Sequence, residues 1–189
     1  MRPDSCRQGI RPVTMSQQSL HVEKSSRSRA LTRFRGRSAR WSIGTSLCLH
    51  ADAQRIFQML TIAEYLETWM CLPDRGAESY VAASRLENEY RLDFYNGRRL
   101  KASVTGSYLV CRRREVMFSW RNMEAASELS IVDIRLRGSF GGTVLELYHA
   151  GLASAAEYFR QMAMWRASLE RLVRLTTNAR FCADAGAKS

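Results

Sequence analysis

Hydrophobic and polar residues alternate where the patterned part of the chain begins, and the period then becomes helical. From Trp41 to Leu49 apolar residues alternate with small or polar ones, which predicts a β-strand. In Ile56–Trp69 apolar residues recur at steps of three and four, which predicts two short helices. We expect Asp52 to cap the first helix and Thr61 the second, because their side-chain oxygens can accept hydrogen bonds from free backbone amides. Pro73–Gly76 then predicts a loop.

A series of strands follows the helices. Further segments with a period of two carry apolar side chains on one face, at residues 89–95, 100–110, 115–121, 129–137 and 143–149. Asn96-Gly97 predicts a tight hairpin between the first two of them, and residues 138–142 predict a glycine-rich hairpin between the last two. Gly106 lies inside a strand and predicts a bulge or sharp bend, while Leu100 and Val110 are expected to face inward with the alternation.

The period changes again after the last strand. Between Ser154 and Thr176 apolar residues step by four and three along one stripe, formed by Tyr158, Met162, Trp165, Leu169 and Leu172. This spacing predicts an amphipathic helix of about six turns. An antiparallel sheet with one apolar face needs a cover, and this helix can supply it. The predicted fold class is therefore α+β, with a curved antiparallel sheet of about six or seven strands wrapped on a long C-terminal helix.

Positive charge is concentrated near the N-terminus. The formal net charge is +11, and residues 1–41 hold ten Arg and Lys against Asp4 and Glu23, so +8 lies there and +3 in the other 148 residues. Residues 1–38 are poor in apolar side chains and are predicted to form a disordered basic tail. This tail is an arm for nucleic acid or anionic lipid, an organellar transit peptide, or an extension ahead of a true start at Met15. We favour the extension, and we expect no nucleic-acid binding except through the tail.

Cysteine and histidine give no signal for a metal site. The five cysteines are odd in number and scattered without a C-x-x-C pair, and the three histidines stand far apart. We therefore expect no metal, no cofactor and no disulfide framework, and reduced cysteines in the cytoplasm. No apolar run approaches the roughly 18–20 residues of a membrane helix, and no apolar segment of a secretory signal follows the basic start.

Several short segments occur in a recognisable order. They are Ala51–Thr61 (ADAQRIFQMLT), Tyr65–Trp69 (YLETW), Thr105–Tyr108 (TGSY), Arg114–Trp120 (REVMFSW), Gly141–Leu152 (GGTVLELYHAGL) and a terminal helix with Trp165 and Leu169. Together they resemble the START-like, or helix-grip, superfamily, and more narrowly the branch named after the activator of the heat-shock-protein-90 ATPase. The resemblance covers Ala39 to Leu175. It predicts one START-like domain at 39–177 and a flexible C-terminal tail at 178–189.

The resemblance implies a helix-grip fold with a cavity or groove between the sheet and the last helix. Members of such families are mostly carriers, sensors or interaction modules for apolar molecules, with a minority of cyclases and hydrolases. The first expectation is thus a non-catalytic binding module for a small hydrophobic molecule. A chaperone-ATPase-activator-like interaction domain and a cyclase or hydratase remain as alternatives. The chain departs from its relatives at Met70–Pro73, where many have a second tryptophan, and at Glu87–Glu89, where a glycine pair is usual.

Eight residues are predicted to line a ligand site. They are the aromatic and methionine set with one histidine: Trp69, Phe94, Tyr108, Phe118, Trp120, His149, Met162 and Trp165. Such sites are mostly apolar with a few polar groups. The competing interpretation is that these side chains simply fill the core between sheet and helix. The residues alone favour the core, and the resemblance brings the two interpretations to balance.

Titratable strand residues offer little for catalysis. Among them only Tyr108 and His149 share the inward parity, whereas Asp93 and Glu146 point outward. No nucleophile–base pair is present in the pattern, so we assign no catalytic residue and expect a protein that is not an enzyme.

Basic residues gather at predicted strand ends. Arg112–Arg114 make one turn, and Arg98, Arg99 and Lys101 lie near another. These residues could hold a phosphate or an acidic partner, or they could be solvated turns that discourage pairing at sheet edges. We favour solvated turns.

Overall fold

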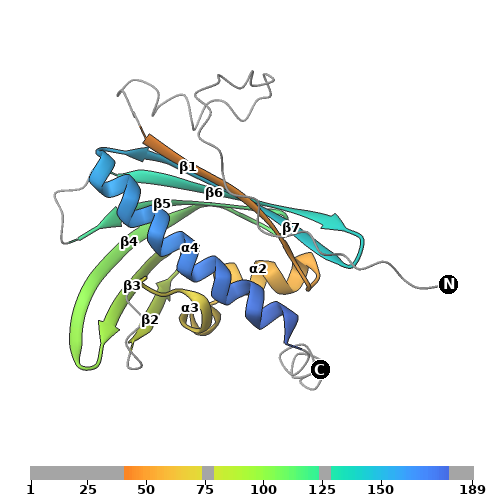
Figure 1. Cartoon of the computed structure of the whole chain (residues 1–189), viewed down its shortest axis with the longest axis horizontal. Coiled ribbons are helices and arrows are strands. Elements are labelled where there is room, and N and C mark those ends of the chain that lie inside the picture. The colour runs from red at the N-terminus through yellow and green to blue at the C-terminus, as the bar shows by residue number, and fades with distance from the viewer. Residues whose placement is uncertain (1–40, 74–78, 124–128, 179–189) are drawn as a thin grey trace. The chain divides into compact units, whose positions relative to one another are not determined.

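The computed structural model describes residues 41–73, 79–123 and 129–178. The chain order is strand β1 (Trp41–Leu49), helices α2 (Ala53–Thr61) and α3 (Ala63–Trp69), strands β2 (Ser79–Leu86), β3 (Glu89–Asn96), β4 (Arg99–Arg112), β5 (Glu115–Asn122), β6 (Ser130–Ser139) and β7 (Gly142–Leu152), and helix α4 (Ala155–Thr177) (Figure 1). The predicted tails at 1–38 and 178–189 lie outside the described residues, apart from Asn178. No helix of the described part is long and apolar enough to cross a membrane.

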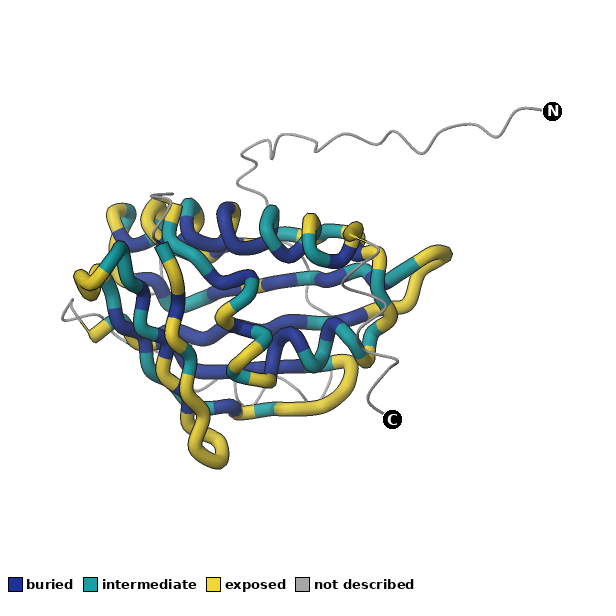
Figure 2. The backbone as a smooth tube through the Cα atoms, turned by 90° about the horizontal axis from the view of Figure 1, so that it is seen from below, coloured by how far each residue is buried: buried dark blue, intermediate teal, exposed yellow. Residues whose placement is uncertain are grey.

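The seven strands form one antiparallel sheet in the order β1-β7-β6-β5-β4-β3-β2. All three helices lie on the same side of this curved sheet, with α4 running across it (Figure 1). Helix α4 packs on β1 and β7, and α3 joins α4 to β2 at the other end of the sheet. Buried stretches of the strands and of α4 face each other across the interior (Figure 2). The predicted α+β helix-grip architecture is confirmed.

Strand β2 (Ser79–Leu86) has no counterpart among the segments singled out from the sequence. It is an edge strand, and only Val81 is buried along its length. A strand that buries one side chain shows almost no alternation, so the period that identifies the other strands is absent here. Its full pairing with β3 fixes it in place.

The helical pair confirms one predicted cap and contradicts the other. Asp52 Oδ1 accepts a hydrogen bond from the Arg55 backbone N–H at 2.8 Å, as an N-cap does. The prediction for Thr61 is wrong, because Thr61 is the last residue of α2 and its hydroxyl donates back to Phe57 O at 2.8 Å. Helix α3 begins after Ile62 without a side-chain cap.

Helix α4 is turned relative to the predicted stripe. Trp165, Leu169 and Leu172 are buried as expected, but Met162 is 38% exposed. Near its N-terminus the helix buries two polar side chains, Glu157 and Gln161, in place of Tyr158 and Met162. Glu157 has a structural reason to lie inside, because its Oε2 accepts a hydrogen bond from the Ala153 N–H at 2.8 Å and holds the helix start.

Strand β4 contains two register shifts, and neither is at Gly106. The shifts lie opposite Phe94/Tyr95 on the β3 side and at Tyr108/Val110 on the β5 side. Each shift reverses the alternation, so Leu100 is exposed and Val110 does not continue the inward face, contrary to prediction. Of the bulge or sharp bend predicted at Gly106, the bulge is wrong, since Tyr90 pairs with Gly106 in continuous register with β3, and the sharp bend stays a prediction.

One residue in the turn between β2 and β3 has a strained backbone conformation. Glu87 has a φ of 52°, in the left-handed region that favours glycine, at the place where the resemblance leads us to expect a glycine pair. Replacing Glu87 by glycine is expected to raise the free energy of unfolding by about 0.5–1 kcal/mol, because the strain is relieved. Glu87→Ala is the control, since it removes the charge but keeps the strain. Equal stability of the two variants in urea denaturation would contradict this account.

Candidate functional site

A small internal cavity lies between the sheet and the helices. Its volume is about 20 Å³, and its wall is made of uncharged side chains: Leu60, Leu66, Trp69, Met70, Tyr90, Leu92, Tyr108, Phe118, Trp120, Ile134 and Trp165. Helices α2 and α3 supply Leu60, Leu66 and Trp69, and Met70 follows the end of α3. Strands β3 to β6 supply six residues, and α4 supplies Trp165. The wall therefore joins elements from almost the whole length of the domain.

Five of the eight predicted residues meet at this cavity: Trp69, Tyr108, Phe118, Trp120 and Trp165. Their role in ligand binding stays a prediction. The other three do not line it. Phe94 is buried elsewhere in the core, and His149 is buried without reaching the cavity. Met162 lies on the exposed side of α4, so the prediction that it faces inward is wrong.

The sequence analysis missed six wall residues. Tyr90 and Leu92 belong to a strand face already identified as apolar, so the signal for them was present in the alternation. Leu60 and Leu66 come from the helical pair and Met70 directly follows it; the inner face of the pair has a helical period but no mark of a cavity. Ile134 comes from β6.

Aromatic rings form a continuous chain along the wall. The ring centroids of Tyr90 and Phe118 are 5.6 Å apart at near right angles, and those of Tyr108 and Phe118 are 5.9 Å apart. The chain continues from Phe118 to Trp120 at 6.2 Å and from Trp120 to Trp165 at 5.4 Å. Contacts of this geometry add stability beyond the apolar area that they bury.

The polar tips of three wall residues are tied to backbone carbonyls. The Tyr90 hydroxyl donates to Ser119 O at 2.8 Å, and the Tyr108 hydroxyl donates to Leu60 O at 3.0 Å. The indole N–H of Trp69 donates to Met59 O at 2.8 Å. These bonds satisfy groups that would be costly to bury alone.

Trp120 is different from the other tryptophans of the wall. Its side chain is 1% exposed, and its indole Nε1–H has no hydrogen-bond partner. A buried donor without a partner costs about 1–3 kcal/mol, so it is an unusual group to keep in an otherwise satisfied wall. Trp120 is the one hydrogen-bond donor left unengaged among the described side chains that line this cavity.

His149 is part of a buried hydrogen-bond relay behind the wall. Trp165 Nε1–H donates to His149 Nδ1 at 3.0 Å, so Nδ1 is an acceptor and the ring proton is on Nε2. Nε2 is 2.8 Å from the Ser130 hydroxyl, which in turn donates to Trp120 O at 3.1 Å. Both ring nitrogens are engaged, and burial lowers the pKa of His149 from 6.5 to about 3. This is a neutral structural histidine.

The lowered pKa makes stability depend on pH. The unfolded chain binds a proton on His149 near pH 6.5, whereas the folded domain resists protonation until about pH 3. Stability is therefore full above pH 6.5 and falls as the pH decreases, by about 2 kcal/mol from this group between pH 6.5 and 5. Urea denaturation across this range is the measurement. A free energy of unfolding that does not fall toward pH 5 would contradict the relay.

Tyr108 is equally unsuited to acid–base chemistry. Burial raises its pKa to about 12, while the Arg85 guanidinium, 4.5 Å from the ring centroid, opposes that rise. Arg85 also donates to Thr61 O at 2.7 Å, so it fastens the end of α2 to the sheet. The tyrosine hydroxyl stays protonated at neutral pH and is occupied by Leu60 O.

The acidic strand residues lie away from the cavity. Asp93 accepts hydrogen bonds from Arg91 and Ser103, and Glu146 pairs with Arg137 at 3.0 Å. Their predicted outward orientation agrees with these partners. Within residues 41–73, 79–123 and 129–178 no group of three or more His, Cys, Asp or Glu side chains could hold a metal ion.

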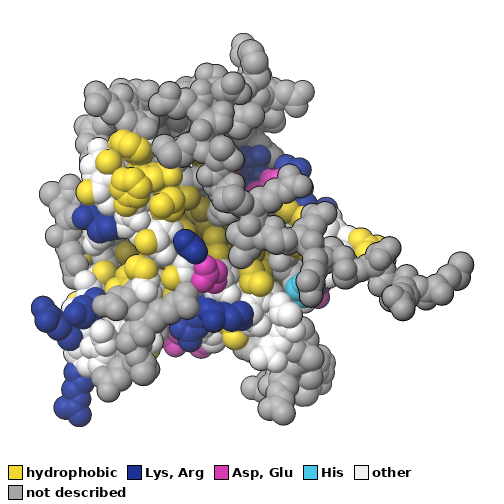
Figure 3. All heavy atoms as spheres, viewed as in Figure 1, with side chains coloured by type: hydrophobic (Ala, Val, Ile, Leu, Met, Phe, Trp, Pro, Cys, Tyr) yellow, Lys and Arg dark blue, Asp and Glu magenta, His cyan; other side chains and the backbone are white. Residues whose placement is uncertain are grey.

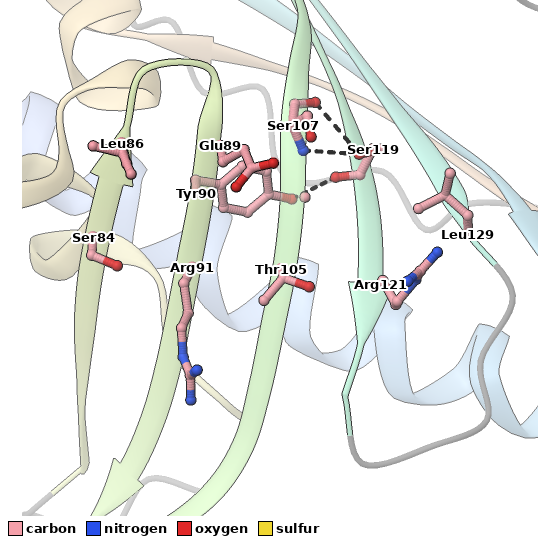
Figure 4. Close-up of a pocket in the computed structure, with 11 residues that line it drawn as sticks. Ser84, Leu86, Glu89, Tyr90, Arg91, Thr105, Ser107, Ser119, Arg121 and Leu129 are labelled. Atoms are coloured by element: carbon pink, nitrogen blue, oxygen red, sulfur yellow. Dashed lines mark hydrogen bonds between the residues drawn. The ribbon is translucent and has the colours of Figure 1, made fainter.

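A larger hollow of about 520 Å³ lies on the outer face of β2 to β5 (Figure 4). The register places its side chains in two rows across the strands: Ser84, Arg91, Thr105 and Arg121 in one, and Leu86, Glu89, Ser107 and Ser119 in the other. It is larger than the internal cavity but polar and carries opposite charges, with Arg91 already bound to Asp93. We therefore take the internal cavity as the candidate site.

Comparison with known proteins identifies the family. The model of the family "Activator of Hsp90 ATPase homolog 1-like protein" matches residues 50–177, which is more than half of the chain. The chain belongs to this family. The resemblance inferred from the sequence is thereby confirmed. No curated protein matches.

Solved structures with the same fold come from several bacteria. Protein CV1439 from Chromobacterium violaceum is 18% identical, has a TM-score of 0.62 and covers 72% of this chain and 98% of its own. The AHSA1 protein from Silicibacter pomeroyi is 18% identical, with a TM-score of 0.58 and coverage of 71% and 96%. CalU16 from Micromonospora echinospora is 19% identical, with a TM-score of 0.51 and coverage of 75% and 80%. At these identities the likeness shows the fold alone, which agrees with the START-like, helix-grip architecture.

The segment Met70–Pro73, where the resemblance leads us to expect a second tryptophan, has a structural role. Met70 lines the cavity, and Cys71 forms a reciprocal pair with Ser168 of α4. The Cys71 N–H donates to Ser168 Oγ at 3.0 Å, and the Ser168 hydroxyl is placed to donate to Cys71 O at 3.1 Å. This pair holds the segment after α3 against the last helix.

Proposed function

We propose that this domain binds a small, uncharged, apolar molecule between the sheet and α4, and that it does so without catalysing a reaction. The observation that carries the proposal is the unpartnered Nε1–H of Trp120 in a wall that is otherwise uncharged and satisfied. A charged ligand would lose its hydration there without finding a compensating charge. An apolar ligand with one hydrogen-bond acceptor would satisfy Trp120 and bury its remaining surface against aromatic rings.

The small cavity requires a movement of its wall before a ligand can bind. A volume of about 20 Å³ is room for about one water molecule, so a ligand must displace part of the wall. The α2–α3 pair is the part best suited to move. It is joined to the sheet and to α4 by side chains, such as Tyr108 to Leu60 O, Arg85 to Thr61 O and Ser168 to Cys71, and not by a strand ladder. Outward movement of this pair would enlarge the cavity without separating any strands.

The alternative of a cyclase or hydratase has less support. Both inward titratable groups are engaged in holding the fold: Tyr108 through Leu60 O, and His149 through Trp165 and Ser130. A general base needs a free acceptor near the substrate and a pKa close to the working pH. Neither residue meets this requirement, which supports a binding role.

Two matched probes test the proposal: indane, which is purely apolar, and 1-indanone, which has the same ring system with one carbonyl. Three of the four tryptophans line the cavity, so tryptophan fluorescence reports on its occupancy. We expect the wild-type protein to bind 1-indanone about two- to tenfold more tightly than indane, because only the ketone accepts from Trp120. In Trp120→Phe this preference disappears, while indane binding remains.

Trp41→Phe is the control for this experiment. Trp41 packs on Tyr158 and is not part of the cavity wall, so this variant should keep the preference for 1-indanone. If neither probe changes the fluorescence of the folded wild-type protein, the proposal is wrong. Stimulation of a chaperone ATPase by a protein that binds no apolar probe would favour the interaction alternative.

A further inference from the structure

The β6–β7 hairpin ends in a fully exposed aromatic side chain. This hairpin projects beyond the other described elements at its own end of the sheet (Figures 1 and 2). Phe140 lies in the turn at its end and is fully exposed. A side chain added at Gly138 or Gly141 would meet nothing within 4 Å, so no described residue packs closely on the tip at these two positions. The ring therefore offers its whole apolar surface to whatever approaches the end of this hairpin.

A second hairpin with three arginines lies beside the base of the β6–β7 hairpin. Arg112–Arg114 join β4 to β5, and all three side chains are exposed. The Leu136 N–H of β6 donates to Arg114 O at 3.0 Å, and Glu115 of β5 lies opposite Arg135 of β6 in the strand register. The arginine turn and the base of the β6–β7 hairpin are therefore adjacent. Basic and hydrophobic side chains both occur on this side of the molecule (Figure 3).

The charge at this end of the sheet is positive. Five arginines, at positions 112, 113, 114, 135 and 137, stand against the acids at 115, 133 and 146, which leaves +2. Arg135 and Arg137 are held by Asp133 and Glu146 at 2.9 and 3.0 Å. The three turn arginines carry the excess. The other basic cluster, Arg98, Arg99 and Lys101, is at the opposite end of β4, so the two clusters do not form one surface.

We propose that this end of the sheet docks on an anionic lipid surface, with the Phe140 ring inserted among the acyl chains and Arg112–Arg114 beside the headgroups. A membrane interface offers an apolar layer under a negatively charged one, which matches a projecting ring next to exposed arginines. Single-stranded nucleic acid is a poorer match, since it needs aromatic platforms on which successive bases stack, and the tip presents one ring. This docking is independent of what the interior binds.

Vesicle flotation with the full-length chain tests the docking. The vesicles are phosphatidylcholine with about one-fifth phosphatidylserine, compared with pure phosphatidylcholine. We expect binding to the anionic vesicles only, and a loss of about tenfold in apparent affinity for Phe140→Ser. Phe159→Ser is the matched control, because Phe159 is also an exposed phenylalanine but lies on α4, away from the tip.

A matched pair of triple variants tests the contribution of charge to vesicle binding. R112Q/R113Q/R114Q and R98Q/R99Q/K101Q remove the same charge from opposite ends of β4. The first should weaken binding by about tenfold or more, and the second much less, because attraction decays within a Debye length of the surface. The basic N-terminal residues are present in every variant, so they do not enter the comparison.

Three outcomes would overturn the proposal. One is absence of binding to anionic vesicles by the folded wild-type chain. Another is an equal loss for the two triple variants, which would show attraction without a defined docking surface. The third is tight binding of single-stranded RNA that Phe140→Ser and R112Q/R113Q/R114Q weaken, with no effect of either on vesicles, which would assign the surface to nucleic acid.

Discussion

Replacing Gly106 by alanine is expected to destabilise the domain by about 3 kcal/mol or more. An added Cβ would lie 1.9 Å from Ser119 O and 2.7 Å from Cε1 of the Tyr90 ring. Ser119 O belongs to the neighbouring strand and already accepts the Tyr90 hydroxyl at 2.8 Å (Figure 4). Relief of the clash would thus separate β4 from β5 and break this bond. Urea denaturation of the purified variant measures the loss.

Gly138→Ala is the control for this effect. Gly138 is also a strand glycine, but an added Cβ there meets nothing within 4 Å, so stability should stay within about 0.5 kcal/mol of the wild type. If Gly106→Ala lowered the free energy of unfolding as little as Gly138→Ala, this would contradict the close packing of Tyr90 over β4. If Gly106→Ala does not yield folded protein, Tyr90→Phe removes only the hydroxyl and should cost about 1–3 kcal/mol.

The second large effect is expected for His149→Phe. Phenylalanine fills similar space but leaves the Trp165 indole N–H without an acceptor and removes the partner of the Ser130 hydroxyl. Unsatisfied buried groups of this kind cost about 2–4 kcal/mol together. The variant should also lose the decline in stability between pH 6.5 and 5, because the group that takes up the proton on unfolding is gone.

His50→Phe is the corresponding control, since His50 is exposed just after β1. It should leave both the stability at pH 7 and the pH dependence unchanged. A decline toward pH 5 that persists in His149→Phe would assign the dependence to other groups and contradict the relay.

The sequence predicts the order and type of most elements because each buries one clear face. The strand of Tyr90, Leu92 and Phe94 alternates cleanly, and all three side chains are buried. Prediction fails where tertiary contacts override the local pattern of apolar and polar residues. Helix α4 buries Glu157 because its carboxylate caps the helix start, and no apolar periodicity could reveal this. Strand β4 reverses its faces at two register shifts that depend on its neighbours.

The candidate site was predictable in its composition but not in its chemistry. Aromatic residues at inward positions, such as Trp120 and Trp165, could be named from spacing alone. The relay from Trp165 through His149 to Ser130 joins α4, β7 and β6, and no sequence interval encodes it. The unpartnered state of Trp120 is likewise a property of three-dimensional contacts, and so is the small volume of the cavity.

Native mass spectrometry of the full-length chain tests the central claim most directly. We predict a mass in excess of the polypeptide from a small neutral molecule, which is lost on unfolding and displaced by 1-indanone. Trp120→Phe should retain less of this molecule than Trp41→Phe. A wild-type protein that shows only the bare polypeptide mass, and that takes up neither indane nor 1-indanone while folded, would contradict an interior binding site.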